Sequence, residues 1–97
     1  MARPQLLNEE DLAALVADHP EWEHDGDYMR RTFVFADFGE AWAFMSRVAL
    51  VSEKLDHHPE WSNVWNRVEV AITTHDAGGL SDLDRRFVAA LDAMVTE

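Results

Sequence analysis

The sequence predicts an α+β fold in which four strands form one antiparallel sheet and three helices pack on one face of it. Two segments alternate apolar and polar residues and each contains a turn signal, so each is expected to form a β-hairpin. Three other segments place apolar residues three and four positions apart, the spacing of a helix with one buried face. The resulting order is α-β-β-α-β-β-α, and paired hairpins with helices on one face are typical of the α+β class.

The first helix is predicted to begin after Asn8 and to end at His19-Pro20. Asn8 can cap the helix, and the three acidic residues after it suit the positive end of the helix dipole. Its apolar face is formed by Leu12, Leu15 and Val16. Pro20 disfavours helical geometry at His19, which ends the element.

The first hairpin is predicted around Asp25-Gly26, a turn dipeptide that joins residues 22–24 to residues 28–35. Along the second strand, alternate residues share a face: Met29, Arg31, Phe33 and Phe35 on one side, and Tyr28, Arg30, Thr32 and Val34 on the other. Neither face is cleanly polar, which favours contact with a partner subunit.

A long helix is predicted from Asp37 to about Asp56. Asp37 and Glu40 resemble a capping box, with aspartate in place of the usual hydroxyl residue. The expected apolar stripe is Phe38, Trp42, Met45, Val48 or Ala49, Ser52 and Leu55. Pro59 disfavours helical geometry at the residue before it, so the pair His57-His58 should lie at the helix end or just beyond it.

The second hairpin is predicted from Trp61 to His75, with the reversal near Asn66-Arg67. Val68, Val70 and Ile72 alternate with smaller or polar residues, which indicates a strand. In this alternation His75 falls on the same side as Thr73, so we expect it to point away from the apolar face. The last helix is expected to start at Ser81–Asp84 and to bury Phe87, Ala90, Leu91, Met94 and Val95.

The bulk composition restricts the class of function. At 97 residues the chain suits one domain spanning 1–97, and its net charge of −11 disfavours direct contact with nucleic acid or anionic lipid. No apolar run is long enough to cross a membrane, and the first residues lack the apolar stretch of a signal peptide. Because cysteine is also absent, a cytoplasmic location is expected.

The candidate chemistry lies at His57, His58 and His75. The negative end of the long helix favours a protonated imidazole, and the carboxylates of Glu53 and Asp56 act in the same direction. Histidines in differing environments can divide acid and base roles in one reaction. Trp61 would add a flat wall for a planar ligand.

Simpler interpretations compete with this one. Taken alone, the His-His-Pro turn is typical of a solvated helix end, and His75 of an exposed strand end. A metal site is the second alternative, but neighbouring side chains on an extended segment point apart, and no zinc-type spacing is present. We expect no metal and no cofactor. The sequence also lacks a phosphate-binding glycine loop, a nucleophilic cysteine and a Gly-x-Ser-x-Gly elbow.

Four groups of residues together resemble the pterin-4a-carbinolamine dehydratase family, also known as 4a-hydroxytetrahydrobiopterin dehydratase. They are the run from Glu53 to Trp61 (Glu-Lys-Leu-Asp-His-His-Pro-Glu-Trp), Asn63 to Asn66, Thr73 to His75, and Gly79 to Ser81 with Asp84. The resemblance extends upstream through 33–38 and 44–49 and covers most of the chain from about Trp22 onward.

The resemblance implies a lyase that removes water from 4a-hydroxytetrahydropterin to give quinonoid dihydropterin in tetrahydrobiopterin recycling. It implies that the catalytic positions are His57, His58 and His75, and that the substrate-binding residues in or beside the pterin pocket are Glu53, Asp56, Pro59, Trp61, Thr74, Asp76, Ala77 and Asp84. It also implies a homodimer or homotetramer and a functional link to an aromatic amino acid hydroxylase. The alternative is a non-catalytic protein-binding module, a dimerisation cofactor or coactivator, on the same fold.

This chain departs from the animal members of the family at two positions. Leu83 stands where they carry an arginine, which removes a charge near the expected pocket mouth, and Trp65 replaces a tyrosine. The three histidines are present, which favours the enzyme over the binding module.

Overall fold

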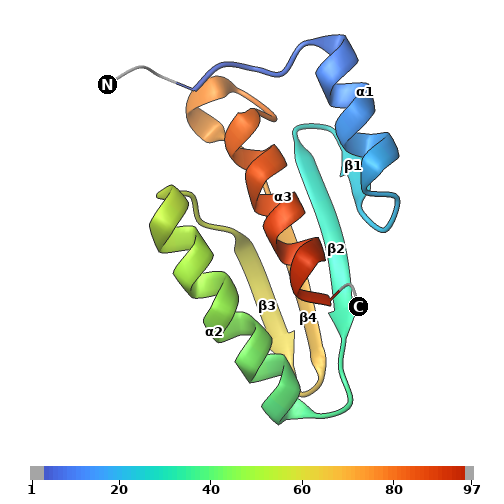
Figure 1. Ribbon diagram of the computed structural model, residues 1–97, viewed down its shortest axis with the longest axis vertical. Helices are drawn as coiled ribbons and strands as arrows, with labels where there is room; N and C mark the ends of the chain where they lie inside the picture. The colour runs from blue at the N-terminus through green and yellow to red at the C-terminus, as the bar shows by residue number, and fades with distance from the viewer. Residues whose placement is uncertain (1–3, 96–97) are drawn as a thin grey trace.

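The computed structural model describes residues 4–95. The elements are α1 (Glu9–Asp18), β1 (Glu23–Asp25), β2 (Tyr28–Val34), α2 (Phe38–Leu55), β3 (Glu60–Val64), β4 (Arg67–Ile72), the one-turn 3-10 helix η1 (His75–Ala77) and α3 (Asp82–Val95). The strands form one antiparallel sheet in the order β1-β2-β4-β3 (Figure 1). The predicted α+β class and element order are confirmed, with η1 as an addition.

The caps predicted for the first two helices are present. The Asn8 side chain accepts a hydrogen bond from the Asp11 N–H at 2.7 Å, and Asp37 Oδ1 accepts one from the Glu40 N–H at 2.8 Å. The reciprocal half of the expected capping box differs, because Glu40 accepts from the N–H of Ala36 and not from that of Asp37.

The two faces of the sheet have opposite characters. Helices α2 and α3 cover one face, while α1 lies beside the β1 edge (Figure 1). The covered face carries the core residues of the strands, which are Met29, Phe33, Val68, Val70 and Ile72. Charged residues such as Glu23, Arg30 and Glu69 lie on the other face, which is open in the described chain.

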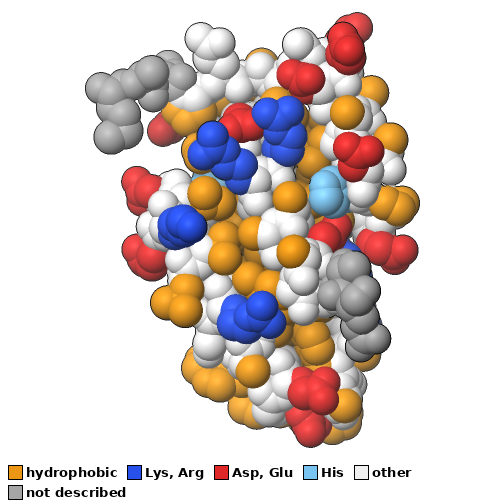
Figure 2. Space-filling view, in the orientation of Figure 1, with side chains coloured by type: hydrophobic (Ala, Val, Ile, Leu, Met, Phe, Trp, Pro, Cys, Tyr) orange, Lys and Arg blue, Asp and Glu red, His pale blue; other side chains and the backbone are white. Residues whose placement is uncertain are grey.

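The buried line of α2 differs from the predicted stripe in its first half. Phe38 and Trp42 are 47% and 58% exposed, and they stack on each other with ring centroids 6.3 Å apart. The buried residues of the helix are Ala41, Phe44, Val48 and Ser52. Phe44 turns this line toward β2, because its ring packs 4.6 Å from that of Phe33. The apolar side chains of Phe38 and Trp42 therefore lie on the solvent-exposed side of the helix. Figure 2 shows hydrophobic side chains over the lower part of α2.

The second hairpin reverses one residue earlier than predicted. Val64 pairs with Arg67, so Trp65 and Asn66 form the turn, and Trp65 adopts a φ of +50°. The side-chain amide of Asn63 donates to the carbonyl oxygens of Trp65 and Arg67 at 3.1 and 2.9 Å and holds the reversal.

A polar cluster around Asp92 ties the N-terminal part of the chain to α3. Asp92 accepts hydrogen bonds from Trp22 Nε1 and from an Arg31 guanidinium nitrogen, each at 2.7 Å, and lies 2.7 Å from His19 Nδ1. These partners come from the end of α1, the segment before β1, and β2. The cluster therefore fixes where α1 lies against the sheet.

Candidate active site

The fold brings the three predicted histidines to one end of the molecule. The end of α2, η1 and the start of α3 meet there, and the N-terminal segment passes beside them (Figure 1). An open cavity of about 980 Å³ lies between these segments, and His57, His58 and His75 all line it. Histidines separated by up to 18 positions in the sequence therefore line one cavity.

His57 is placed by the end of α2. Asp56 takes a left-handed conformation, with φ of 51°, and ends the helix there. The His57 N–H then donates to the Ser52 carbonyl at 3.0 Å, which turns the chain inward. His57 is only 8% exposed, and its ring meets that of Phe87 edge-on, with centroids 6.4 Å apart. The prediction that the histidine pair lies just beyond the helix end is confirmed.

A fully buried carboxylate, Asp84, holds the His57 ring. Its Oδ1 lies 2.6 Å from His57 Nε2, and its Oδ2 accepts from Thr74 Oγ1 at 2.7 Å and from the Ser81 N–H at 2.8 Å. The Ser81 and Thr74 hydroxyls are 2.7 Å apart. Since an ionised carboxylate only accepts, Thr74 donates to Asp84 and Ser81 donates to Thr74. The start of α3 favours the negative charge.

The contact with Asp84 leaves the second ring nitrogen of His57 without a side-chain partner in the described residues. Nε2 carries the proton that is donated to Asp84, so Nδ1 is the second ring nitrogen. No side-chain hydrogen bond within residues 4–95 uses Nδ1, yet no polar side-chain atom in this part of the chain is fully buried without a partner. Nδ1 is therefore not fully buried, and His57 is one of the residues that line the cavity.

His58 and His75 have different surroundings from His57. Both are exposed, and each lies 3.5 Å from a carboxylate oxygen: His58 Nε2 from Glu53 and His75 Nε2 from Glu60. His75 begins η1 and leaves the apolar face, as its position in the strand pattern predicted. The site thus combines one anchored imidazole with two at the rim.

The cavity takes in only part of the predicted pterin-binding set. Asp56, Thr74 and Asp76 line it. Glu53, Pro59, Trp61, Ala77 and Asp84 are not among its lining residues. Asp84 is fully buried and contacts the cavity through residues that line it, His57, Thr74 and Ser81. Trp61 pairs with Val70 in the sheet and packs against the core.

Other residues enter the site from places that the sequence patterns did not indicate. Pro4 and Gln5 from the N-terminal segment and Arg86 from α3 line the cavity, together with Leu83, which the resemblance had placed near the pocket mouth. The N-terminal segment is held by a bridge between Leu6 and Ser81 and by a hydrogen bond from the Leu7 N–H to the Leu80 carbonyl at 2.9 Å. No local pattern signals such a contact, because it joins opposite ends of the chain.

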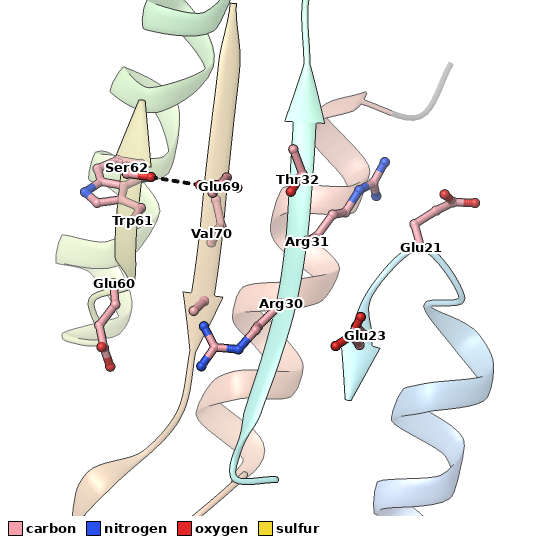
Figure 3. A pocket seen from close by; sticks show the side chains of 11 residues that line it. Glu21, Glu23, Arg30, Arg31, Thr32, Glu60, Trp61, Ser62, Glu69 and Val70 are labelled. Atoms are coloured by element: carbon pink, nitrogen blue, oxygen red, sulfur yellow. Dashed lines mark hydrogen bonds between the residues drawn. The ribbon is translucent and has the colours of Figure 1, made fainter. Parts of the chain in front are cut away.

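The cavity at the histidines is not the only one in residues 4–95. A second, of about 550 Å³, lies on the open face of the sheet, and carboxylates and arginines line it without any histidine (Figure 3). The larger cavity is the better candidate for proton transfer, because three histidines line it and histidine is the side chain most often used as a general acid or base. In the described part of the chain, no three side chains of the metal-binding types are grouped to hold an ion. No helix there is long and apolar enough to span a membrane.

Known proteins share this sequence and fold. A family model described as pterin 4 alpha carbinolamine dehydratase matches residues 5–94. A protein from Novosphingobium aromaticivorans is 54% identical over 91 residues, covering 92% of this chain and 95% of its own. One from Rhizorhabdus wittichii is 52% identical over 90 residues, covering 91% and 93%. Both carry the provisional name pterin-4-alpha-carbinolamine dehydratase.

Two solved structures are also similar. The crystal structure of a transcriptional coactivator/pterin dehydratase from Brucella melitensis superposes with a TM-score of 0.88 at 37% identity, covering 95% of this chain and 100% of the other. A pterin dehydratase-like protein identified as a RuBisCO assembly factor in the alpha-carboxysome superposes with a TM-score of 0.65 at 21% identity, covering 78% and 88%. The second likeness concerns the fold alone.

Proposed function

This chain belongs to the pterin 4 alpha carbinolamine dehydratase family, and on that premise we propose that it removes water from 4a-hydroxytetrahydropterin. The product is quinonoid dihydropterin. The observation that supports the proposal is the buried pair His57–Asp84, whose histidine lines a cavity together with two further histidines.

His57 is proposed as the principal acid and base. With Nε2 donating to Asp84, Nδ1 of the neutral ring can accept the proton that leaves N5 of the pterin. The imidazolium so formed is stabilised by the Asp84 carboxylate. Nδ1 then returns the proton to the hydroxyl leaving C4a, so that the N5–H and C4a–O bonds break, the C4a=N5 double bond forms and water departs. Asp84 acts as a positioning residue in this scheme.

His58 and His75 are proposed to bind and orient the pterin from the rim of the cavity. Both are exposed and have carboxylate neighbours. Asp56, Thr74 and Asp76 line the same space and are proposed to contact the substrate. Glu53, Pro59, Trp61 and Ala77 would act from beside the pocket. The proposed reaction occurs in the cytoplasm and follows an aromatic amino acid hydroxylase, which supplies the 4a-hydroxypterin.

The test is the decay of chemically generated 4a-hydroxytetrahydropterin, followed by stopped-flow absorbance. Wild-type protein should accelerate the decay, and His57→Ala and His75→Ala should each lose most of that acceleration, by about 100-fold or more for His57. His24→Ala is the matched control, because His24 contacts the Gly26 carbonyl and does not line the cavity. A wild-type rate equal to the buffer rate would refute the proposal.

Self-association is a second part of the proposal. Large apolar side chains are exposed on α2, where Trp42 and Leu50 are 58% and 73% exposed, and on the β3–β4 turn, where Val64 and Trp65 are 74% and 62% exposed. Such a surface favours contact with further copies of the chain. Sedimentation equilibrium of the wild type should give the molar mass of a dimer or tetramer. The molar mass of Trp42→Glu should be lower and closer to that of the monomer.

The exposed apolar surface also supports the alternative function, a protein-binding module that does not need catalysis. The Brucella melitensis structure carries coactivator in its name, which gives this alternative a structural relative. A strain in which the gene for this protein is deleted distinguishes the two functions. The module predicts that His57→Ala still complements the deletion, whereas the dehydratase predicts that it does not.

A further inference from the structure

Glu60 joins His75 to Tyr28, a residue outside the predicted site. One carboxylate oxygen, Glu60 Oε2, accepts a hydrogen bond from the Tyr28 hydroxyl at 2.7 Å and lies 3.5 Å from His75 Nε2. The rings of Tyr28 and His75 also meet edge-on, with centroids 6.4 Å apart. Three side chains from β2, β3 and η1 thus form one contact group.

The sheet places this group between the two cavities. Glu60 is the first residue of β3, and its side chain lies at the end of the open sheet face, where Arg30 is its neighbour across β4 (Figure 3). The Arg30 guanidinium lies 4.6 Å from the centre of the Tyr28 ring, and it is paired with Asp25. His75 faces the other cavity, with His57 and His58.

The pKa of Tyr28 agrees with a strong hydrogen bond to Glu60. The hydrogen bond to the Glu60 carboxylate raises the pKa of Tyr28 above its ordinary value of 10.0. The slight burial of the ring and the negative charges of Glu60 and Asp27 act in the same direction, while Arg30 opposes them. The phenol therefore stays protonated and continues to donate to Glu60 over the range in which enzymes work.

We propose that Glu60, held by Tyr28, is a positioning residue that orients the imidazole of His75 toward the pterin. The inference rests on the proposed dehydratase function. The His75 side chain is 77% exposed, so without a fixed partner it would sample several rotamers. A carboxylate already oriented by the phenol offers Nε2 one preferred direction, and an oriented group lowers the entropic cost of reaching the transition state.

The first part of the experiment tests the contact without any catalysis. Tyr28 is the only tyrosine of the chain, so the ultraviolet absorbance change of phenol ionisation reports this residue alone. Glu60→Gln should lower the midpoint of that titration toward 10, because the charged acceptor is lost. Glu69→Gln is the matched control: Glu69 is exposed on the same sheet face but contacts Ser62 and Arg67. Equal midpoints for wild type and Glu60→Gln would overturn the inference.

The second part measures kcat and KM in the dehydratase assay. Tyr28→Phe, which keeps the ring, and Glu60→Gln should each lower kcat about 3- to 10-fold with little change in KM, while Glu69→Gln stays at the wild-type value. In a His75→Ala background, Glu60→Gln should have no further effect, because Glu60 acts through His75. Additive losses in that background would overturn the inference.

The outcomes separate the two proposals. An active wild type whose kcat is unchanged by Glu60→Gln overturns this inference and leaves the dehydratase standing. A wild type no faster than buffer overturns both.

Discussion

Replacing Asp84 by asparagine is expected to lower the free energy of unfolding by about 3 kcal/mol. The reason is that the buried carboxylate accepts hydrogen bonds from three donors, which are His57, Thr74 and the Ser81 N–H. An amide carries only one oxygen, and that oxygen can continue to accept from Thr74 and the Ser81 N–H. Its NH2 group would then face His57 Nε2, which lies 2.6 Å from Asp84 Oδ1 in the wild type. The hydrogen bond from Nε2–H to the charged carboxylate is therefore lost, and the ring can accept a neutral bond from the amide only by moving its proton to Nδ1.

The magnitude follows from the number and type of these hydrogen bonds. A hydrogen bond to a charged group contributes about 1.5–3 kcal/mol net, which sets the loss at His57. The other two bonds weaken from charged to neutral, by a few tenths to about 1 kcal/mol each. Such a domain has a total stability of about 5–15 kcal/mol, so a large part of it would disappear. The melting temperature should fall by about 10–20 °C.

Urea unfolding followed by tryptophan fluorescence measures this loss, since the chain contains four tryptophans. The slope of free energy against urea concentration should not change, which shows that the same surface unfolds. Asp82→Asn is the control: Asp82 lies on the same helix, is 42% exposed in its side chain and pairs with the exposed Arg85 and Arg86, so we expect a change within about 0.5 kcal/mol. An Asp84→Asn variant as stable as this control would refute the reasoning.

The remaining predictions concern packing and a surface hydrogen bond. Asp92→Ala should cost about 3 kcal/mol in urea unfolding, because donors from three segments lose their acceptor. Phe87→Ala removes a fully buried ring and should cost about 3–5 kcal/mol; a smaller loss would mean that the cavity collapses. Gly79→Ala should cost about 1–3 kcal/mol, because Gly79 has a φ of +157°, which L residues rarely adopt, and its Cβ would also lie 2.9 Å from the Leu6 side chain. The raised pKa of Tyr28 means that its hydrogen bond stabilises the fold fully below pH 10.0 and that this contribution is lost as pH rises through the raised value; melting curves of Tyr28→Phe should therefore lack this alkaline decline.

Much of the fold could be predicted because its signals are local. The caps at Asn8 and Asp37, the turn at Gly26 and the helix end before Pro59 depend on a few neighbouring residues. The face of α2 could not be predicted in the same way. Phe38 and Phe44 are equally apolar, and only the position of Phe33 on the neighbouring strand decides which of them is buried.

The candidate site, too, could be predicted only where its signals are local. His57 and His75 were identified from residue type and position at element ends, and both line one cavity. The role of Asp84 needed the tertiary structure: the sequence indicates a helix start at 81–84, while the structure shows that its carboxylate also holds His57. No sequence pattern indicated that Gln5 lines this cavity.

By itself the sequence determined the element order, the caps of the first two helices and the identity of the titratable groups, since these follow from backbone preferences and side-chain chemistry over a few residues. The tertiary structure alone decided which imidazole is anchored and which are exposed, and that Glu60 lies between Tyr28 and His75. The physical reason is that hydrogen bonds and burial depend on distance in space, and the partners in these contacts are 27, 32 and 15 residues apart along the chain.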